Sequence, residues 1–238
     1  MNPFDEIIIR FLNQFANRSP EFDSVMVFIR TANVLKGGVI VGLLWWVWFS
    51  NTDNRARNRE IILATFLGAF GAMFAARALA FLLPFRFRPL HDAAVGFHLP
   101  YGMVPEALDG WSSFPSDHAA LFFALTTGLC FVSCRLGLIA TLYTIFVICF
   151  PRVYLGLHYP TDIIGGALIS VSTVWMTNQL SVRDRTVRPA LAWVDRHPSS
   201  FYPAFFLISQ QIVNLFEDVR VAGSGSLALL KRIEYFLQ

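Results

Sequence analysis

Long stretches without charge alternate with short polar segments along this chain. The uncharged stretches are Gly37–Thr52, Ile61–Phe85 (interrupted only by Arg77), Ala119–Cys134, Leu136–Pro151, Ile163–Val182 and the less apolar Pro198–Phe216. A membrane-spanning helix needs about 20 mostly apolar residues, within a range of about 17–25, so several stretches must extend into their flanks. Backbone amides inside a bilayer have to bond within their own segment, which favours helices. The pattern predicts an all-α protein, a polytopic transmembrane helical bundle of about six spans that forms one domain over residues 1–238.

The first 15 residues follow a different pattern. Apolar residues recur there at helical spacing, with Asp5, Glu6 and Arg10 between them: Phe4, Ile7, Ile8, Phe11, Leu12 and Phe15. This spacing predicts an amphipathic helix, which can lie in the membrane interface or pack on the bundle as ordinary core. Near the other end, the flexible stretch VAGSGS precedes Leu227–Leu237, for which we expect another surface helix.

Composition agrees with a membrane protein and excludes several other classes. Hydrophobic residues make up 55% of the chain and the mean hydropathy is +0.52, which is too apolar for an ordinary soluble domain of this length. The net charge of only +3 does not indicate a strongly basic surface for nucleic acid, so we expect no nucleic-acid partner. The three cysteines lack the spacing of a zinc site, and we expect neither a disulfide framework nor a cofactor.

The arginines predict how the chain is oriented. One cluster occupies the polar segment NTDNRARNRE between the first two predicted spans, and a second occupies SVRDRTVRPALAWVDR after the fifth. Loops rich in arginine and lysine favour the cytoplasmic side. The opposite side then holds residues 84–115 and the short connection of residues 151–160.

Three short stretches on that opposite side carry the candidate chemistry. They are LPFRFRPL, FPSDHAA and PRVYLGLHYPTD, and each lies where an apolar helix is predicted to begin or end. Their polar residues are Arg86, Arg88, Ser116, Asp117, His118, Arg152, His158 and Asp162. Arginines bind phosphoryl oxygens by charge-assisted bonds, while one histidine can attack phosphorus and another can protonate the leaving oxygen. The set therefore suits a phosphate ester.

Two predicted helix starts explain how these residues are presented. Ser116 is a good N-cap residue, so the free amides of its helix and its hydroxyl can bind an anion, with His118 in the first turn. Pro160 suits the first helical position, so His158 precedes a helix and Asp162 lies in its first turn. The carboxylate can then bond one ring nitrogen of His158 and leave the other free, as the acid of a catalytic triad does.

These residues resemble the signature of the type 2 phosphatidic acid phosphatases, or lipid phosphate phosphatases. That signature reads Lys-x6-Arg-Pro, Pro-Ser-Gly-His and Ser-Arg-x5-His-x3-Asp, and the matching residues here fall within residues 82–166. Arg88 with Pro89 matches the end of the first part. Pro115, Ser116 and His118 match the second part, and Arg152, His158 and Asp162 match the third.

The chain departs from the signature at two important positions. Phe81 stands where the lysine is expected, and we predict that the neighbouring Arg86 replaces it, with Arg77 as the alternative. Asp117 stands where glycine is usual, which is similar to bacterial polyprenyl diphosphate phosphatases. Its negative charge would weaken anion binding unless it points away or pairs with an arginine.

The resemblance implies a mechanism that needs no metal. His158 is expected to be the nucleophile that forms a phosphohistidine, oriented by Asp162. His118 is expected to be the general acid and then the general base. The expected ligands of the phosphoryl oxygens are Arg88, Ser116 and Arg152, and the substrate-binding site is expected to include Arg86 and Asp117 as well.

The resemblance also implies a substrate and a location. We expect a lipid-linked phosphate or diphosphate, foremost a polyprenyl diphosphate, to be hydrolysed at the outer surface of a bacterial inner membrane. Phosphatidate or phosphatidylglycerophosphate is the alternative substrate. A non-catalytic lipid-binding or transport protein is the alternative from another class. The sequence leaves the oligomeric state open.

Overall fold

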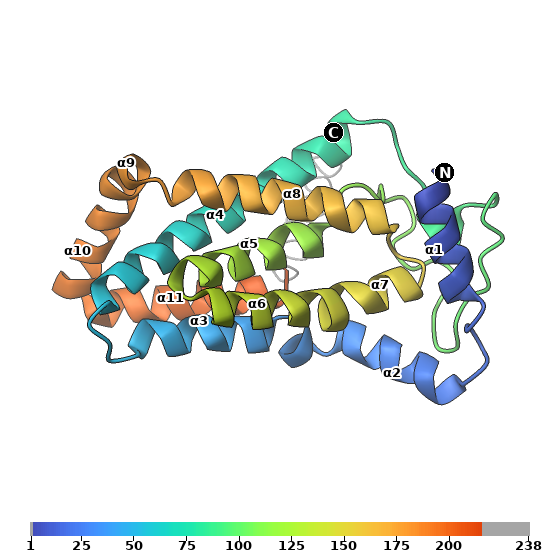
Figure 1. Ribbon diagram of the computed structural model, residues 1–238, viewed down its shortest axis with the longest axis horizontal. Coiled ribbons are helices and arrows are strands. Elements are labelled where there is room, and N and C mark those ends of the chain that lie inside the picture. Colours follow the sequence, from blue (N-terminus) through green and yellow to red (C-terminus); the bar gives the residue numbers. More distant parts are fainter. Residues whose placement is uncertain (1, 216–238) are drawn as a thin grey trace, which may run out of the picture.

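All secondary structure that the computed structural model describes, over residues 2–215, is helical. The elements are α1 (Pro3–Asn13), α2 (Pro20–Thr31), η1 (Val34–Gly38), α3 (Val39–Phe49), α4 (Arg55–Leu82), η2 (Pro89–His91), α5 (Asp117–Val132), α6 (Cys134–Tyr143), η3 (Thr144–Cys149), α7 (Phe150–Tyr154), α8 (Pro160–Thr177), α9 (Leu180–Val182), η4 (Arg183–Val187), α10 (Arg188–Arg196) and α11 (Pro198–Val213). The long helices run side by side in one elongated bundle (Figure 1). The all-α prediction is confirmed for these residues, while the helix predicted at Leu227–Leu237 lies outside them.

The predicted spans coincide with helices, but fewer of these helices are long enough to cross a bilayer. Among the described residues, two helices have the necessary length and apolar character, α4 and the continuous helix Cys134–Tyr154. A third span results if α2 and the helix Val34–Phe49, which are bent by 60° at their junction, cross as one. Since α5 and α11 have only 16 residues each, a total of six spans stays a prediction.

Two glycines allow the central helices to approach closely. Helix α5 packs against α4, α6 and α8. A side chain on Gly128 of α5 would collide with the side chain of Thr65 on α4. A Cβ atom on Gly166 of α8 would lie 2.7 Å from the Ser116 carbonyl oxygen. The first turns of α5 and α8 therefore lie together, and the Ser116 amide donates a hydrogen bond of 3.1 Å to the Asp162 carbonyl.

The two ends of the bundle differ in chemistry. Helices α9 and α10 and the α3–α4 connection gather at one end, whereas α1, the long loop after α4 and the α7–α8 connection gather at the other (Figure 1). At the first end, Glu60 pairs with Arg183 at 3.8 Å and with Arg188 at 3.7 Å, so the two arginine-rich segments meet. The predicted separation of these segments from the three motif stretches is confirmed, and the orientation across a membrane stays a prediction.

Helix α1 contacts the bundle through an unexpected face. Ile9 and Asp5 are completely buried, while Phe4, Ile7 and Phe11 are 51%, 69% and 57% exposed. A helix is present over Pro3–Asn13, within the first 15 residues where an amphipathic helix was predicted. The alternative that its apolar stripe packs as ordinary core is wrong for these three residues, and its position in the membrane interface stays a prediction.

Candidate active site

The imidazole of His158 is held in one tautomer by its neighbours. Its Nδ1 atom lies 2.9 Å from the carbonyl oxygen of Ser113, and its Nε2 atom lies 3.4 Å from Nη1 of Arg88. A carbonyl can only accept a hydrogen bond and a guanidinium can only donate one. Nδ1 therefore carries the proton, and Nε2 presents its lone pair, as a nucleophile requires.

Asp162 lies behind this ring as the centre of a buried network. Its Oδ2 atom accepts hydrogen bonds from the Ser113 hydroxyl at 2.5 Å and from the Tyr159 amide at 2.7 Å. The same oxygen lies 3.6 Å from Nδ1 of His158. The predicted proximity of the two side chains is confirmed, but the direct partner of Nδ1 is the Ser113 carbonyl. Ser113 connects the two side chains, because its hydroxyl donates to Asp162 and its carbonyl oxygen contacts Nδ1.

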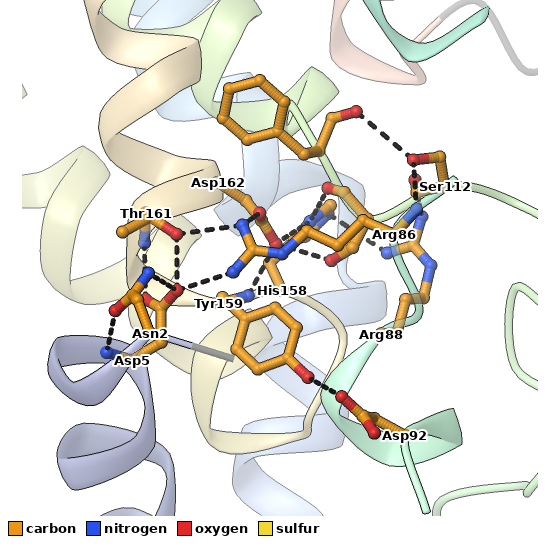
Figure 2. Close-up of polar contacts among 12 residues, drawn as sticks. Asn2, Asp5, Arg86, Arg88, Asp92, Ser112, His158, Tyr159, Thr161 and Asp162 are labelled. Carbon is orange, nitrogen blue, oxygen red and sulfur yellow. Dashed lines mark hydrogen bonds and ion pairs between the residues drawn. The ribbon is translucent and has the colours of Figure 1, made fainter. Parts of the chain in front are cut away.

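Arg86 faces this network from the other side. Its guanidinium bridges two completely buried carboxylates, Asp162 at 2.5 Å and Asp5 of α1 at 2.6 Å (Figure 2). It also lies over the ring of Tyr159, 4.3 Å from the centroid. The Asp5 carboxylate accepts further bonds from the amide and hydroxyl of Thr161 at 3.0 Å and 2.6 Å. The Arg86 side chain thus faces carboxylates. Arg86 lines neither of the two cavities that His158 lines, which are described below.

Arg88 is fixed by the backbone close to the attacking nitrogen. It is 6% exposed and donates to the carbonyl oxygens of Leu157 at 2.5 Å, Trp111 at 3.2 Å and Ser112 at 3.3 Å. Desolvation lowers the pKa of Arg88 to about 10, so it is still a cation at neutral pH. Its position places a permanent positive charge beside Nε2 of His158, where phosphoryl oxygens would be stabilised.

His158 lines two cavities. The smaller, which we call the Arg88 cavity, has a volume of about 130 Å³ and includes Arg77, Arg88 and Asp117 in its wall. The larger, which we call the Lys36 cavity, has a volume of about 340 Å³ and includes Lys36, His118 and Arg152. Of the described residues, His158 alone belongs to both walls. The two predicted catalytic histidines therefore face one common space.

Asp117 pairs with an arginine, which is one of the two arrangements under which its charge would not weaken anion binding. Its carboxylate pairs with Arg77 at 2.5 Å, and Arg77 also lies over the ring of Trp111 at 5.0 Å. The pair neutralises the added negative charge in the wall of the Arg88 cavity. Arg77 thereby enters the site from the end of α4, beside Arg88.

The remaining predicted residues occupy the first turn of α5 and the end of α7. Ser116 is the N-cap of α5, as predicted: its hydroxyl accepts from the Ala119 amide, and its side chain is completely buried. Arg152 is 2% exposed and donates to the carbonyl oxygen of Ile148. His118 is half-buried in the wall of the Lys36 cavity. The structure thus brings His118 and Arg152 to the cavity, whereas Ser116 lies behind its surface.

Sequence reasoning missed four residues at this site. Ser113 and Asp5 belong to no motif. Ser113 contacts His158, 45 positions away, and Asp5 bonds to Thr161, 156 positions away, so no local pattern marks them. Arg30 and Lys36 line the Lys36 cavity from a segment that the motifs do not include. Lysine is rare in this chain, and a lysine directly before an apolar stretch was the one signal that could have indicated Lys36.

Burial sets the charge state of the proposed nucleophile. Desolvation lowers the pKa of His158, and the nearby Arg88 charge lowers it further, while the adjacent Asp162 carboxylate opposes both effects. The net direction is downwards, which keeps the ring neutral at neutral pH. A neutral ring is the form whose Nε2 lone pair can attack phosphorus.

Comparison with known proteins agrees with this chemistry. The model of the PAP2 superfamily matches residues 61–185. Undecaprenyl-diphosphatase BcrC of Bacillus subtilis is 26% identical over 164 residues, which cover 69% of this chain and 77% of that protein. The putative undecaprenyl-diphosphatase YbjG of Escherichia coli is 23% identical over 175 residues, covering 71% and 81%. No solved structure matches the chain. With more than half of its residues matched and its arginines and histidines gathered at one site, the chain belongs to the PAP2 superfamily and is a membrane lipid phosphatase.

Proposed function

We propose that this protein hydrolyses a polyprenyl diphosphate through a phosphohistidine intermediate on His158, at the outer surface of a bacterial inner membrane. The observation that carries the proposal is the fixed tautomer of His158, whose Nε2 faces Arg88 at 3.4 Å while Nδ1 is held by Ser113 at 2.9 Å. The two undecaprenyl-diphosphatases support the choice of a polyprenyl diphosphate.

The first chemical step transfers the phosphoryl group to the enzyme. The Nε2 lone pair of His158 forms a bond to phosphorus, and the bond from phosphorus to the leaving oxygen breaks. The electron pair of that bond stays on the leaving oxygen, which receives a proton from His118. Arg88 and Arg152 stabilise the negative charge that is spread over the other phosphoryl oxygens.

The second step releases phosphate. The oxygen of a water molecule attacks phosphorus while His118 takes one of its protons. The N–P bond breaks, its electron pair returns to Nε2, and inorganic phosphate leaves. His118 and His158 are then back in their initial states, so the cycle needs no cofactor.

A substrate panel tests the function directly. Purified protein in detergent is given polyprenyl diphosphates, polyprenyl monophosphates, phosphatidate and phosphatidylglycerophosphate, and the released phosphate is measured. We expect the highest kcat/KM for a polyprenyl diphosphate. A preference for a glycerolipid would reassign the substrate, and the absence of turnover on every lipid would favour a non-catalytic lipid-binding protein.

The activity is expected to survive chelation by EDTA. Arginines supply the positive charge that a metal ion would supply in a metal-dependent phosphatase. In the described part of the chain, no group of three His, Cys, Asp or Glu residues is arranged to hold a metal. The check is phosphate release before and after EDTA treatment, and a loss that added magnesium restores would contradict the proposed mechanism.

The acidic limb of the profile of kcat/KM against pH is expected to have its midpoint below the ordinary pKa of histidine. The pKa of His158 is lowered from 6.5, so the ring stays neutral to a lower pH than a solvated histidine does. Protonation at still lower pH removes the Nε2 lone pair, and activity should then fall. The measurement is kcat/KM as a function of pH, and a midpoint of the acidic limb above 6.5 would contradict the inferred state of His158.

The site is expected to open away from the cytoplasm. A cysteine at Ala94, an exposed position in the loop beside the site, should react with a membrane-impermeant thiol reagent in intact cells. The experiment uses a background without the three native cysteines and, where an outer membrane exists, permeabilises it. Labelling that requires cell lysis would reverse the orientation and move the substrate to the inner leaflet.

A further inference from the structure

The Lys36 cavity is more basic than hydrolysis of a single phosphate ester requires. Three basic side chains lie in its wall: Arg30, Lys36 and Arg152. None of the described residues that line it is Asp or Glu, whereas Asp117 lies in the wall of the Arg88 cavity. Its volume of about 340 Å³ is at the lower end of the range of ~300–1,000 Å³ for ligand pockets. The cavity therefore has both the charge and the space to bind an anionic group.

Two of these cations come from outside the family match. Arg30 lies in the last turn of α2 and Lys36 in η1, both before residue 61, where the match begins. The 60° bend between α2 and the following helix lies between them, and both side chains reach the same cavity. Lys36 is only 8% exposed.

The geometry of transfer indicates which part of the substrate enters this cavity. Phosphoryl transfer requires the attacking and leaving atoms to lie roughly in line on opposite sides of phosphorus. Nε2 of His158 is the attacking atom, and His118, the proposed proton donor to the leaving oxygen, belongs to the wall of the Lys36 cavity. The leaving group consequently occupies that cavity. A simple alcohol leaving group would not need several arginine and lysine side chains, but a phosphate group would.

We propose that the Lys36 cavity binds the non-transferred phosphate of a lipid diphosphate, with Arg30 and Lys36 as its dedicated ligands. Arg152 is shared with the transferred phosphoryl group. The inference rests on the proposed function, because it takes His158 as the nucleophile, and it adds the basis of selectivity for a diphosphate over a monophosphate. The leaving group in this scheme is a lipid monophosphate, which the added charges stabilise as the bridging bond breaks.

The test compares two substrates that share one tail. Farnesyl diphosphate and farnesyl monophosphate are supplied in detergent to the full-length protein and to Arg30→Gln and Lys36→Met. Both substitutions remove a charge and keep an extended side chain. We expect the ratio of kcat/KM for the diphosphate to that for the monophosphate to fall about 10- to 1000-fold in each variant, the scale for loss of one transition-state donor.

Arg18→Gln is the matched control, because Arg18 is an exposed arginine that lies outside the walls of both cavities. It should keep the wild-type ratio. An unchanged ratio in both Arg30→Gln and Lys36→Met, or equal losses on both substrates, overturns the inference while the proposed function stands. Failure of the wild-type protein to release phosphate from either lipid overturns the proposed function instead.

A measurement on the wild-type protein keeps the inference testable if the variants do not fold. Methylenediphosphonate, which offers two linked phosphonates, should inhibit at least about tenfold more strongly than methylphosphonate, because it occupies both phosphate positions. Equal inhibition by the two compounds would show that no second phosphate is bound, and the inference would be wrong.

Discussion

Replacing His158 with alanine is expected to abolish phosphate release, with a loss of roughly 10⁴- to 10⁶-fold in kcat, the scale seen when a catalytic nucleophile is removed. The reason is geometric. The Ser113 carbonyl and Arg88 hold the ring so that Nε2 carries the lone pair, and His158 lines both cavities. Alanine removes the atom that forms the bond to phosphorus, and the remaining arginines can bind the substrate but cannot attack it.

The measurement is phosphate release in detergent, accompanied by trapping of the acid-labile phosphoenzyme. His98→Ala is the matched control, because His98 is exposed and lies outside both cavity walls. The control should retain activity. Substantial turnover by His158→Ala, or a phosphoenzyme that persists in it, would assign the nucleophile to another residue.

Replacing Arg86 with alanine is expected to destabilise the protein by about 3 kcal/mol, because it leaves two buried carboxylates without their shared cation. Asp5 and Asp162 are both completely buried, and Arg86 reaches them at 2.6 Å and 2.5 Å. The free energy of unfolding in detergent measures this loss. Adding Asp5→Asn to Arg86→Ala removes one of the unpaired charges and should restore part of the stability.

Arg77→Ala is the informative comparison. The side chains of Arg77 and Asp117 are 25% and 21% exposed, so loss of their ion pair should cost about 1 kcal/mol or less. The kcat/KM of Arg77→Ala should nevertheless fall about 10- to 1000-fold, because Arg77 lines the Arg88 cavity and we now propose it, rather than Arg86, as the replacement for the missing motif lysine. A stable but inactive Arg86→Ala, together with an active Arg77→Ala, would return that role to Arg86.

This pair of predictions shows how far the sequence determines the site. The motif spacing predicted that His118, His158 and Arg152 lie together, because their positions follow from where helices begin and end. All three line one cavity in the structure. Closeness in sequence suggested that Arg86 lies beside Arg88, but it could not reveal that Asp5, 81 positions earlier, lies against the Arg86 guanidinium. A charge pairs with whatever opposite charge the fold brings near, and that depends on tertiary contacts.

The fold shows the same division. The apolar stretches predicted the positions of the helices, because the length and spacing of apolar residues are local signals for a helix. The bend between α2 and the following helix, which carries Arg30 and Lys36 to the cavity, lacked a signal in that pattern because neither a proline nor a charge run marks it. The packing of the helices could not be predicted from the sequence either. A glycine is required at position 166 only because the Ser116 carbonyl oxygen of another segment lies opposite it.

The bond between Asp5 and Thr161 also has a consequence for biosynthesis. These residues are 156 positions apart, so the N-terminal helix leaves the ribosome long before its partner does. Chains are made at about 5–20 residues per second, and Asp5 therefore waits roughly ten to thirty seconds for Thr161 and Arg86 to surround it. Until α8 has been made, Asp5 lacks its bonds to Thr161 and Arg86 lacks its pairing with Asp162, so the carboxylate network is incomplete. We therefore expect a nascent chain to be inert towards the lipids around it until the second half of the protein has joined the first.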